Sequence, residues 1–153
     1  MTQGTSDFSF TALMAQRARE LALSLDSDQQ ALVAQLDTLG WRLLAQSAAP
    51  GKGLYVWGRT GRGKSLLVDS FFAGLPLAAK RRVHFHSFFR ELHQRLNAPT
   101  SPSLPAVIAQ MTDGCRLICF DEFHLHDPAD AMLVKPLLAQ LFQRGVVLMA
   151  TSN

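Results

Sequence analysis

The sequence predicts an α/β fold in which helices cover both faces of a mostly parallel β-sheet, with two further helices ahead of it. Short apolar runs alternate with amphipathic segments after residue 53, and this alternation is typical of crossover units in parallel sheets. The apolar runs do not alternate with polar residues, as expected for strands buried on both faces. The chain has 153 residues, 48% hydrophobic and 18% charged, enough for a core of its own.

The N-terminal 50 residues contain two expected helices. Residues 10–25 carry apolar side chains at helical spacing. Ser27 and Gln30 have the spacing of a capping box, which predicts a second helix from there to about residue 45. We therefore divide the chain into an N-terminal polar segment with helices, residues 1–50, and a core, residues 51–153.

The core is expected to contain four strands and four helices. The strands are expected at residues 54–57, 83–86, 116–120 and 146–150. The helices are expected at residues 64–72, 88–96, 105–113 and 128–144. Asp127-Pro128 has the pattern of an N-cap followed by proline at the first helical position. Ligands of such sheets bind at the carboxyl ends of the strands.

A glycine-rich loop between the first strand and its helix matches the phosphate-binding pattern G-x-x-x-x-G-K-[ST] at every fixed position. Its backbone N–H groups would form an anion site at a helix N-terminus, because glycine lets the backbone approach phosphate oxygens. Lys64 would neutralise the outer phosphates, and Ser65 would bind magnesium. The nucleotide-binding residues predicted here are Gly58, Arg59, Thr60, Gly61, Arg62, Gly63, Lys64 and Ser65.

An apolar strand ends in the carboxylates Asp121 and Glu122. The ends of parallel strands project to one edge, so Asp121 is expected to reach a magnesium ion held by Ser65. Glu122, just beyond it, can orient or deprotonate an attacking water. Asn153, at the tip of the fourth strand, could hold that water or the terminal phosphate. Thr151 is less specific.

The five histidines all lie between residues 84 and 126. On the expected strand, His84 and His86 share a face, and a zinc site could be drawn from such residues. No cysteine or carboxylate spacing of a known zinc class accompanies them, so a role near the phosphates or in packing is favoured. Cys115 and Cys119, four apart on an extended segment, are too far apart for a disulfide and indicate reduced, buried, cytosolic thiols.

Charge is uneven along the chain. Residues 51–100 carry nine basic and two acidic residues, whereas residues 1–50 and 101–153 each carry three basic and five acidic ones. This distribution indicates a localised anion site. No long stretch interleaves basic and aromatic residues, so a nucleic-acid groove is not favoured. No apolar run approaches the roughly 20 residues of a membrane span, and the N-terminus lacks the pattern of a signal peptide.

Six blocks of sequence, in order, are similar to the ZapE cell-division ATPase family, also called Afg-one-like ATPases, of the AAA+ class of P-loop proteins. The similarity covers about residues 26–153. The blocks are GLYVWG (53–58), GRGKS (61–65), RVHFH (82–86), CFDEF (119–123), DPADAM (127–132) and RGVVLMATSN (144–153).

The resemblance implies a P-loop NTPase fold and ATP hydrolysis with Mg²⁺. Lys64 and Ser65 match the Walker A residues, Asp121 and Glu122 the Walker B pair, and Asn153 the sensor-one residue. It also implies a cytoplasmic bacterial protein recruited to the division site, with the tubulin-like division GTPase as protein partner. Mitochondrial relatives are linked to the inner membrane, so the resemblance also implies that peripheral membrane association is an option. Membership of the AAA+ class implies an oligomer of the full-length form.

Some positions depart from the family pattern. Arg59 and Thr60 stand where glycine and valine are common, and Ser87 and His126 also differ. The family continues past Asn153 with a further strand, an arginine finger and a second sensor. We therefore expect an incomplete sheet and slow hydrolysis by these 153 residues alone, since an arginine finger contributes about 10³ to 10⁵ in rate.

Three other functions stay open at this point. The first is a nucleotide-dependent binding module without efficient turnover. The second is a small-molecule kinase, although Glu122 beside Asp121 suits attack by water better. The third is a DNA-associated AAA+ loader, which a steep salt dependence of DNA binding would support.

Overall fold

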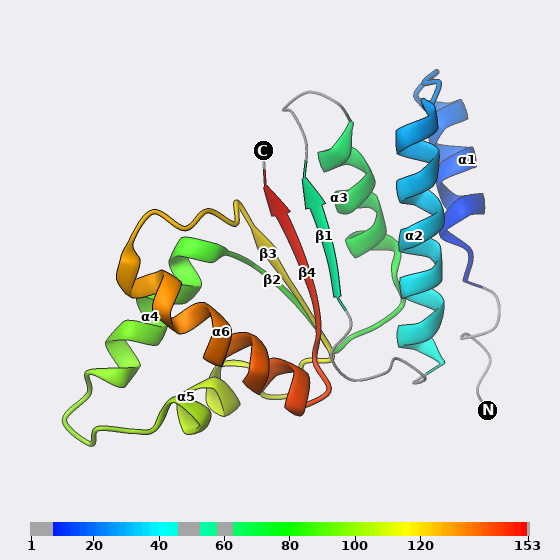
Figure 1. Cartoon of the computed structure of the whole chain (residues 1–153). Coiled ribbons are helices and arrows are strands. Elements are labelled where there is room, and N and C mark those ends of the chain that lie inside the picture. The colour runs from blue at the N-terminus through cyan, green and yellow to red at the C-terminus, as the bar shows by residue number, and fades with distance from the viewer. Residues whose placement is uncertain (1–7, 46–52, 58–62, 153) are drawn as a thin grey trace. The chain divides into compact units, whose positions relative to one another are not determined.

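The computed structural model of the chain describes residues 8–45, 53–57 and 63–152, and for residues 53–57 it describes the backbone (Figure 1). The elements are, in order, α1 (Phe10–Glu20), α2 (Ser27–Leu44), β1 (Gly53–Trp57), α3 (Lys64–Gly74), β2 (Lys80–His84), α4 (Phe85–Leu96), α5 (Leu104–Met111), β3 (Leu117–Asp121), α6 (Pro128–Gln143) and β4 (Val147–Ser152). No helix in the described part of the chain is long and apolar enough to cross a bilayer.

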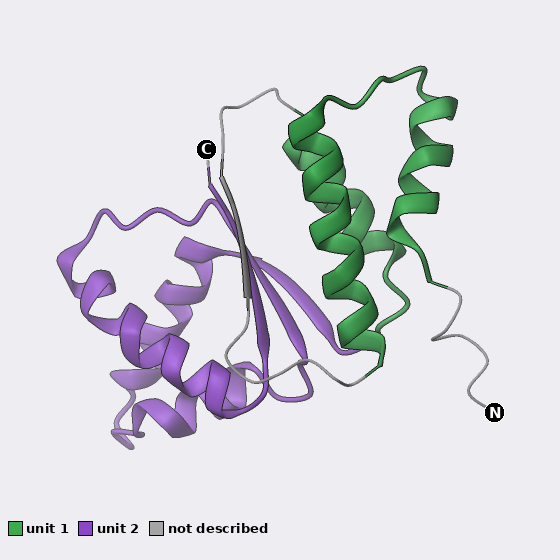
Figure 2. Ribbon diagram, turned by 45° about the vertical axis from the view of Figure 1, so that its right-hand side comes forward, with its two compact units in different colours: residues 1–48, 58–78 green, residues 49–57, 79–153 purple. Residues whose placement is uncertain are grey.

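The chain forms two compact units, which Figure 2 colours separately. The first contains residues 1–48 and 58–78, with α1, α2 and α3. The second contains residues 49–57 and 79–153, with the four strands and α4, α5 and α6. The division into residues 1–50 and 51–153 that the sequence suggested stays a prediction.

The second unit is built on a four-stranded sheet of order β1-β4-β3-β2, in which every neighbouring pair is parallel. Helices α4, α5 and α6 gather on one face of this sheet (Figure 1). Their apolar side chains pack with Ile118, Phe120 and Ala150 in one core. The parallel sheet with its helices confirms the predicted α/β fold class, of P-loop NTPase type. Among the described strands β1 and β2 are the edges.

The first unit packs three helices around buried aromatic and aliphatic side chains. Phe10 of α1 meets Phe71 of α3 edge-on, with ring centroids 5.4 Å apart. Asp37 of α2 fixes the start of α1, because its Oδ1 accepts the Phe10 N–H at 2.8 Å. Gly40 lets α2 pack closely, since a Cβ there would lie 3.0 Å from the Phe71 ring.

Two expected features of the N-terminal helices are wrong. Helix α1 ends at Glu20 rather than near residue 25, because Ala22 adopts φ 53 and the Leu23 N–H bonds the Ala18 carbonyl at 2.8 Å. That pattern closes a helix as a Schellman motif. The capping box lies one residue earlier than expected, on Asp26 and Gln29, whose side chains each accept the other's backbone N–H. Aspartate caps a helix as well as serine does.

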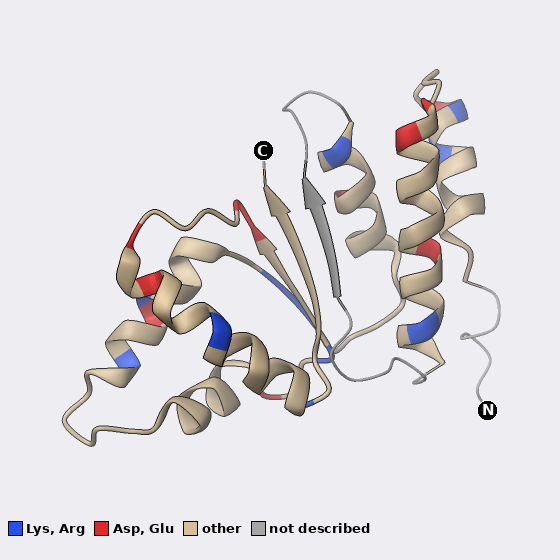
Figure 3. Cartoon of the chain, viewed as in Figure 1, with Lys and Arg blue, Asp and Glu red and all other residues tan. Residues whose placement is uncertain are grey.

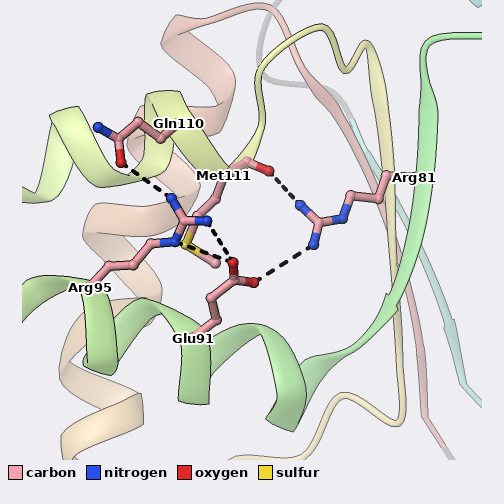
Figure 4. Close-up of polar contacts among 5 residues, drawn as sticks. All are labelled: Arg81, Glu91, Arg95, Gln110 and Met111. Atoms are coloured by element: carbon pink, nitrogen blue, oxygen red, sulfur yellow. Dashed lines mark hydrogen bonds and ion pairs between the residues drawn. The ribbon is translucent and has the colours of Figure 1, made fainter.

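The strand expected at residues 83–86 lies at Lys80–His84, and Phe85 and His86 already belong to α4. The run of basic residues is compatible with a strand because each arginine finds a partner. Figure 4 shows Arg81 donating to the Met111 carbonyl, at 2.6 Å, and approaching Glu91. The expectation that His84 and His86 share one face of a strand is therefore wrong. The other elements lie within a few residues of their expected bounds.

Candidate functional site

The described part of the phosphate loop is Gly63, Lys64 and Ser65, at the start of α3. Gly63 is the N-cap residue with φ 75, a conformation that favours glycine, and it makes no side-chain capping hydrogen bond because it has no side chain. A helix start of this kind presents backbone N–H groups to an anion. Partial burial lowers the pKa of Lys64 below its ordinary value, because desolvation disfavours the charged ammonium. Residues 58–62 lie outside the described residues.

The capping box of α2 adjoins this loop. A Cβ on Gly63 would lie 2.5 Å from the side-chain nitrogen of Gln29. A cavity of about 370 Å³ opens beside the two residues. It is lined by Leu23, Ser24, Leu25, Asp26, Gln29, Gly63 and Leu66. This lining combines apolar side chains with hydrogen-bonding groups, which is typical of small-molecule sites.

Asp121, the last residue of β3, is held by two neighbouring strands. Arg82 of β2 donates from Nε to Oδ2 at 2.6 Å and from Nη2 to Oδ1 at 3.0 Å. The hydroxyl of Thr151, on β4, donates to Oδ1 at 3.2 Å. The carboxylate thus lies at the carboxyl edge of the sheet, the edge at which ligands of α/β folds bind. Figure 3 shows basic residues on β2 and acidic residues at the end of β3.

Glu122 follows directly and has a different environment. Its side chain is 63% exposed, and its Oε2 lies 4.0 Å from Nδ1 of His84. Its backbone has φ 54, a left-handed conformation that costs energy for a residue with a side chain. The next N–H, of Phe123, donates to the Thr151 carbonyl at 2.8 Å and so ties this turn to β4. Glu122 is therefore turned out of the strand, toward solvent, beside the half-buried carboxylate of Asp121.

Three other histidines extend this edge. The rings of His86 and His126 stack with centroids 5.9 Å apart, and His124 lies 5.7 Å from His126. Within the described ranges, no three His, Cys, Asp or Glu side chains are grouped so as to hold a metal ion. Cys119 is buried and Cys115 half-buried, and neither forms a disulfide.

The residues predicted to bind magnesium carry suitable ligand atoms. Ser65 offers a hydroxyl at the exposed first turn of α3, and Asp121 offers a carboxylate. Hard oxygen ligands of this kind suit Mg²⁺. The prediction that Asp121 reaches an ion held by Ser65 spans the two units and stays a prediction. Asn153 lies outside the described residues.

No role was predicted from the sequence for Arg82, which hydrogen-bonds Asp121, or for Gln29, which lies against Gly63. Thr151, the third of these neighbours, was named only as a less specific residue. Arg82 belongs to a basic run that by itself indicates only a solvated face. Two features together indicate that Arg82 can reach Asp121. Arg82 stands two residues before the end of its strand, and that strand neighbours the one ending in Asp121. Side chains two apart on a strand share a face.

The family model of AFG1-like ATPases matches residues 4–153. The Escherichia coli cell division protein ZapE is 44% identical over 107 residues, which cover 68% of this chain and 28% of that protein. Lactation elevated protein 1 homolog B of Danio rerio is 37% identical over 118 residues, 68% of this chain and 23% of that protein. The chain spans about a quarter of the length of these curated relatives. It belongs to the AFG1-like ATPase family.

Proposed function

We propose that the protein binds ATP with Mg²⁺ and hydrolyses it. The observation that carries this proposal is the start of α3, where Gly63, at φ 75, precedes Lys64 and Ser65 at the positions that the phosphate-loop motif requires. Membership of an ATPase family supports it. In this role the N-terminal N–H groups of α3 and the Lys64 ammonium bind the phosphates. Gly58, Arg59, Thr60, Gly61 and Arg62 complete the loop.

Each further site residue has one task in this proposal. Ser65 and Asp121 hold the magnesium ion, which when bound neutralises charge on the phosphate oxygens. Glu122 orients the attacking water and accepts its proton, a task that its outward position and exposed carboxylate suit. Asn153 contacts the water or the terminal phosphate. The cavity of about 370 Å³ beside Gly63 takes the base and ribose, for which Gln29 and Asp26 offer hydrogen-bonding groups.

The name of one relative supports a proposal for the biological setting. That relative is named a cell division protein, and we place this chain in the same process, in the cytoplasm and recruited to the division site. Its partner there is a protein, the tubulin-like division GTPase, and the full-length form is an oligomer with peripheral membrane association.

The experiment compares the wild type with Glu122→Gln in two assays, phosphate release from ATP and binding of ATP. The proposal predicts that the substitution abolishes phosphate release and leaves binding within about threefold, since the amide keeps the shape but cannot accept a proton. Binding without any phosphate release by the wild type would favour a nucleotide-dependent binding module instead. Loss of binding in Glu122→Gln would contradict the role given to that residue.

A further inference from the structure

We infer that Arg82 is the positioning residue for Asp121 and sets the magnesium dependence of nucleotide binding. The inference rests on the proposed function, because it concerns the carboxylate assigned there to magnesium. It starts from the two charge-assisted hydrogen bonds between the side chains, 2.6 Å and 3.0 Å long. Such a fork fixes the plane of a carboxylate as well as its distance.

The pair is partly shielded from water. The side chains of Arg82 and Asp121 are 27% and 19% exposed. Thr151 adds a third donor, on Oδ1. An ionised carboxylate has about four acceptor positions, so these three donors, counted over the described residues, leave about one for a further group. With respect to those donors the remaining position lies on Oδ2, because Oδ1 accepts from both Arg82 and Thr151.

The strand register explains why Arg82, and not its neighbour, has this role. Arg82 pairs with Cys119 and His84 with Asp121 in the ladder between β2 and β3. Arg82 and Asp121 therefore lie on one face, two residues apart along the strands. Arg81 points to the opposite face, where it binds the Met111 carbonyl and Glu91 (Figure 4). The two arginines lie on the same strand and carry the same functional group, but they bind different partners.

Fixing a ligand carboxylate in this way affects metal affinity. Partners that orient metal ligands typically contribute 10- to 100-fold to metal affinity or activity. Lysine would keep the positive charge beside Asp121 but lose the planar fork. Replacing Arg82 by lysine therefore separates orientation from charge: a positioning role needs the fork, whereas simple charge neutralisation needs only a cation.

The test measures the dissociation constant of ADP for the full chain, once with Mg²⁺ and once with EDTA, by calorimetry. The ratio of the two constants is the magnesium enhancement. We expect Arg82→Lys to lower this enhancement about tenfold or more while the affinity in EDTA stays unchanged. Thr151→Val should lower it less, by a few-fold. Arg81→Lys, the matched control on the same strand, should leave it unchanged.

Other results overturn the inference. If Arg82→Lys and Thr151→Val, each tested alone, both keep the wild-type magnesium enhancement, the hydrogen bonds to Asp121 have no part in that enhancement. This holds even if both variants melt at a lower temperature. A larger enhancement in Arg82→Gln than in the wild type would show that Arg82 competes with the metal by its charge. Absence of any enhancement in the wild type would overturn the proposed magnesium site itself, and the inference with it.

Discussion

The side-chain amide of Gln29 lies directly against the backbone of Gly63, so that a Cβ at Gly63 would come 2.5 Å from the Gln29 nitrogen. The two residues open α2 and α3, and the contact ties the capping box of one helix to the phosphate loop of the other. We predict that Gly63→Ala is destabilising for two reasons. Alanine at φ 75 costs about 1–2 kcal/mol. Displacing Gln29 from its bond to Asp26 costs about 0.5–1.5 kcal/mol more.

Urea unfolding measures this effect, and Gly145→Ala is the matched control. Gly145 has φ 73, but nothing lies within 4 Å of the Cβ position. It should therefore lose only the backbone contribution of about 1–2 kcal/mol. If both substitutions cost the same, the contact between Gln29 and Gly63 contributes nothing to stability.

The second prediction concerns the position of the capping box. Asp26→Ala should reduce the free energy of unfolding by about 1 kcal/mol, because it removes the acceptor of the Gln29 N–H. Ser27→Ala, one residue further along, should change it by less than about 0.5 kcal/mol, as is usual for exposed positions. Thermal and urea unfolding of the two variants check this. The reverse order would place the cap on Ser27.

The third prediction concerns Phe85, which opens α4. It is fully buried, with its ring 4.4 Å from those of Phe89 and Phe123. Phe85→Ala should cost about 3–5 kcal/mol, the usual loss for a large buried aromatic side chain. His86→Ala, an exposed neighbour in the same turn, should cost less than about 0.5 kcal/mol. Equal losses of stability in urea unfolding would contradict a start of α4 that buries Phe85 and exposes His86.

The fourth prediction concerns Glu91, which lies between Arg81 and Arg95 (Figure 4). All three side chains are more than a third exposed, so solvent screens their interactions. Glu91→Gln should therefore lower stability by less than about 1 kcal/mol at low salt. The difference should shrink further in 0.5 M NaCl, since salt screens exposed charges. A large loss that salt does not change would indicate a structural role beyond the ion pairs.

Much of the fold could be predicted from the sequence because apolar strands and capped helices leave local signals. Asp127 and Pro128 marked the start of α6 correctly, through a cap that the structure confirms with a 2.9 Å bond to the Ala129 N–H. The bounds of β2 could not be predicted. Its basic side chains find partners 30 or more residues away, such as Asp121, and no local pattern reports such partners.

The candidate site could be predicted only where its residues belong to sequence motifs. Gly63 and Lys64 were predicted from the fixed spacing of the phosphate-loop motif, and Asp121 and Glu122 from an apolar strand that ends in two carboxylates. The left-handed backbone of Glu122 and the fork on Asp121 were not, since both depend on how strands pair. Sequence patterns predicted the chemistry, and the structure shows which side chains hydrogen-bond Asp121.

Calorimetric titration with ATP and Mg²⁺ tests whether the start of α3 holds the phosphates of ATP, as we propose. Lys64→Ala should weaken binding at least about tenfold, the loss of about 1.4 kcal/mol expected when a charged phosphate contact is removed. Lys80 is a suitable control, because burial lowers its pKa as well. The variant Lys80→Ala should bind ATP as the wild type does. Equal affinity of the wild type and Lys64→Ala, or no binding by the wild type, would contradict a phosphate site at the start of α3.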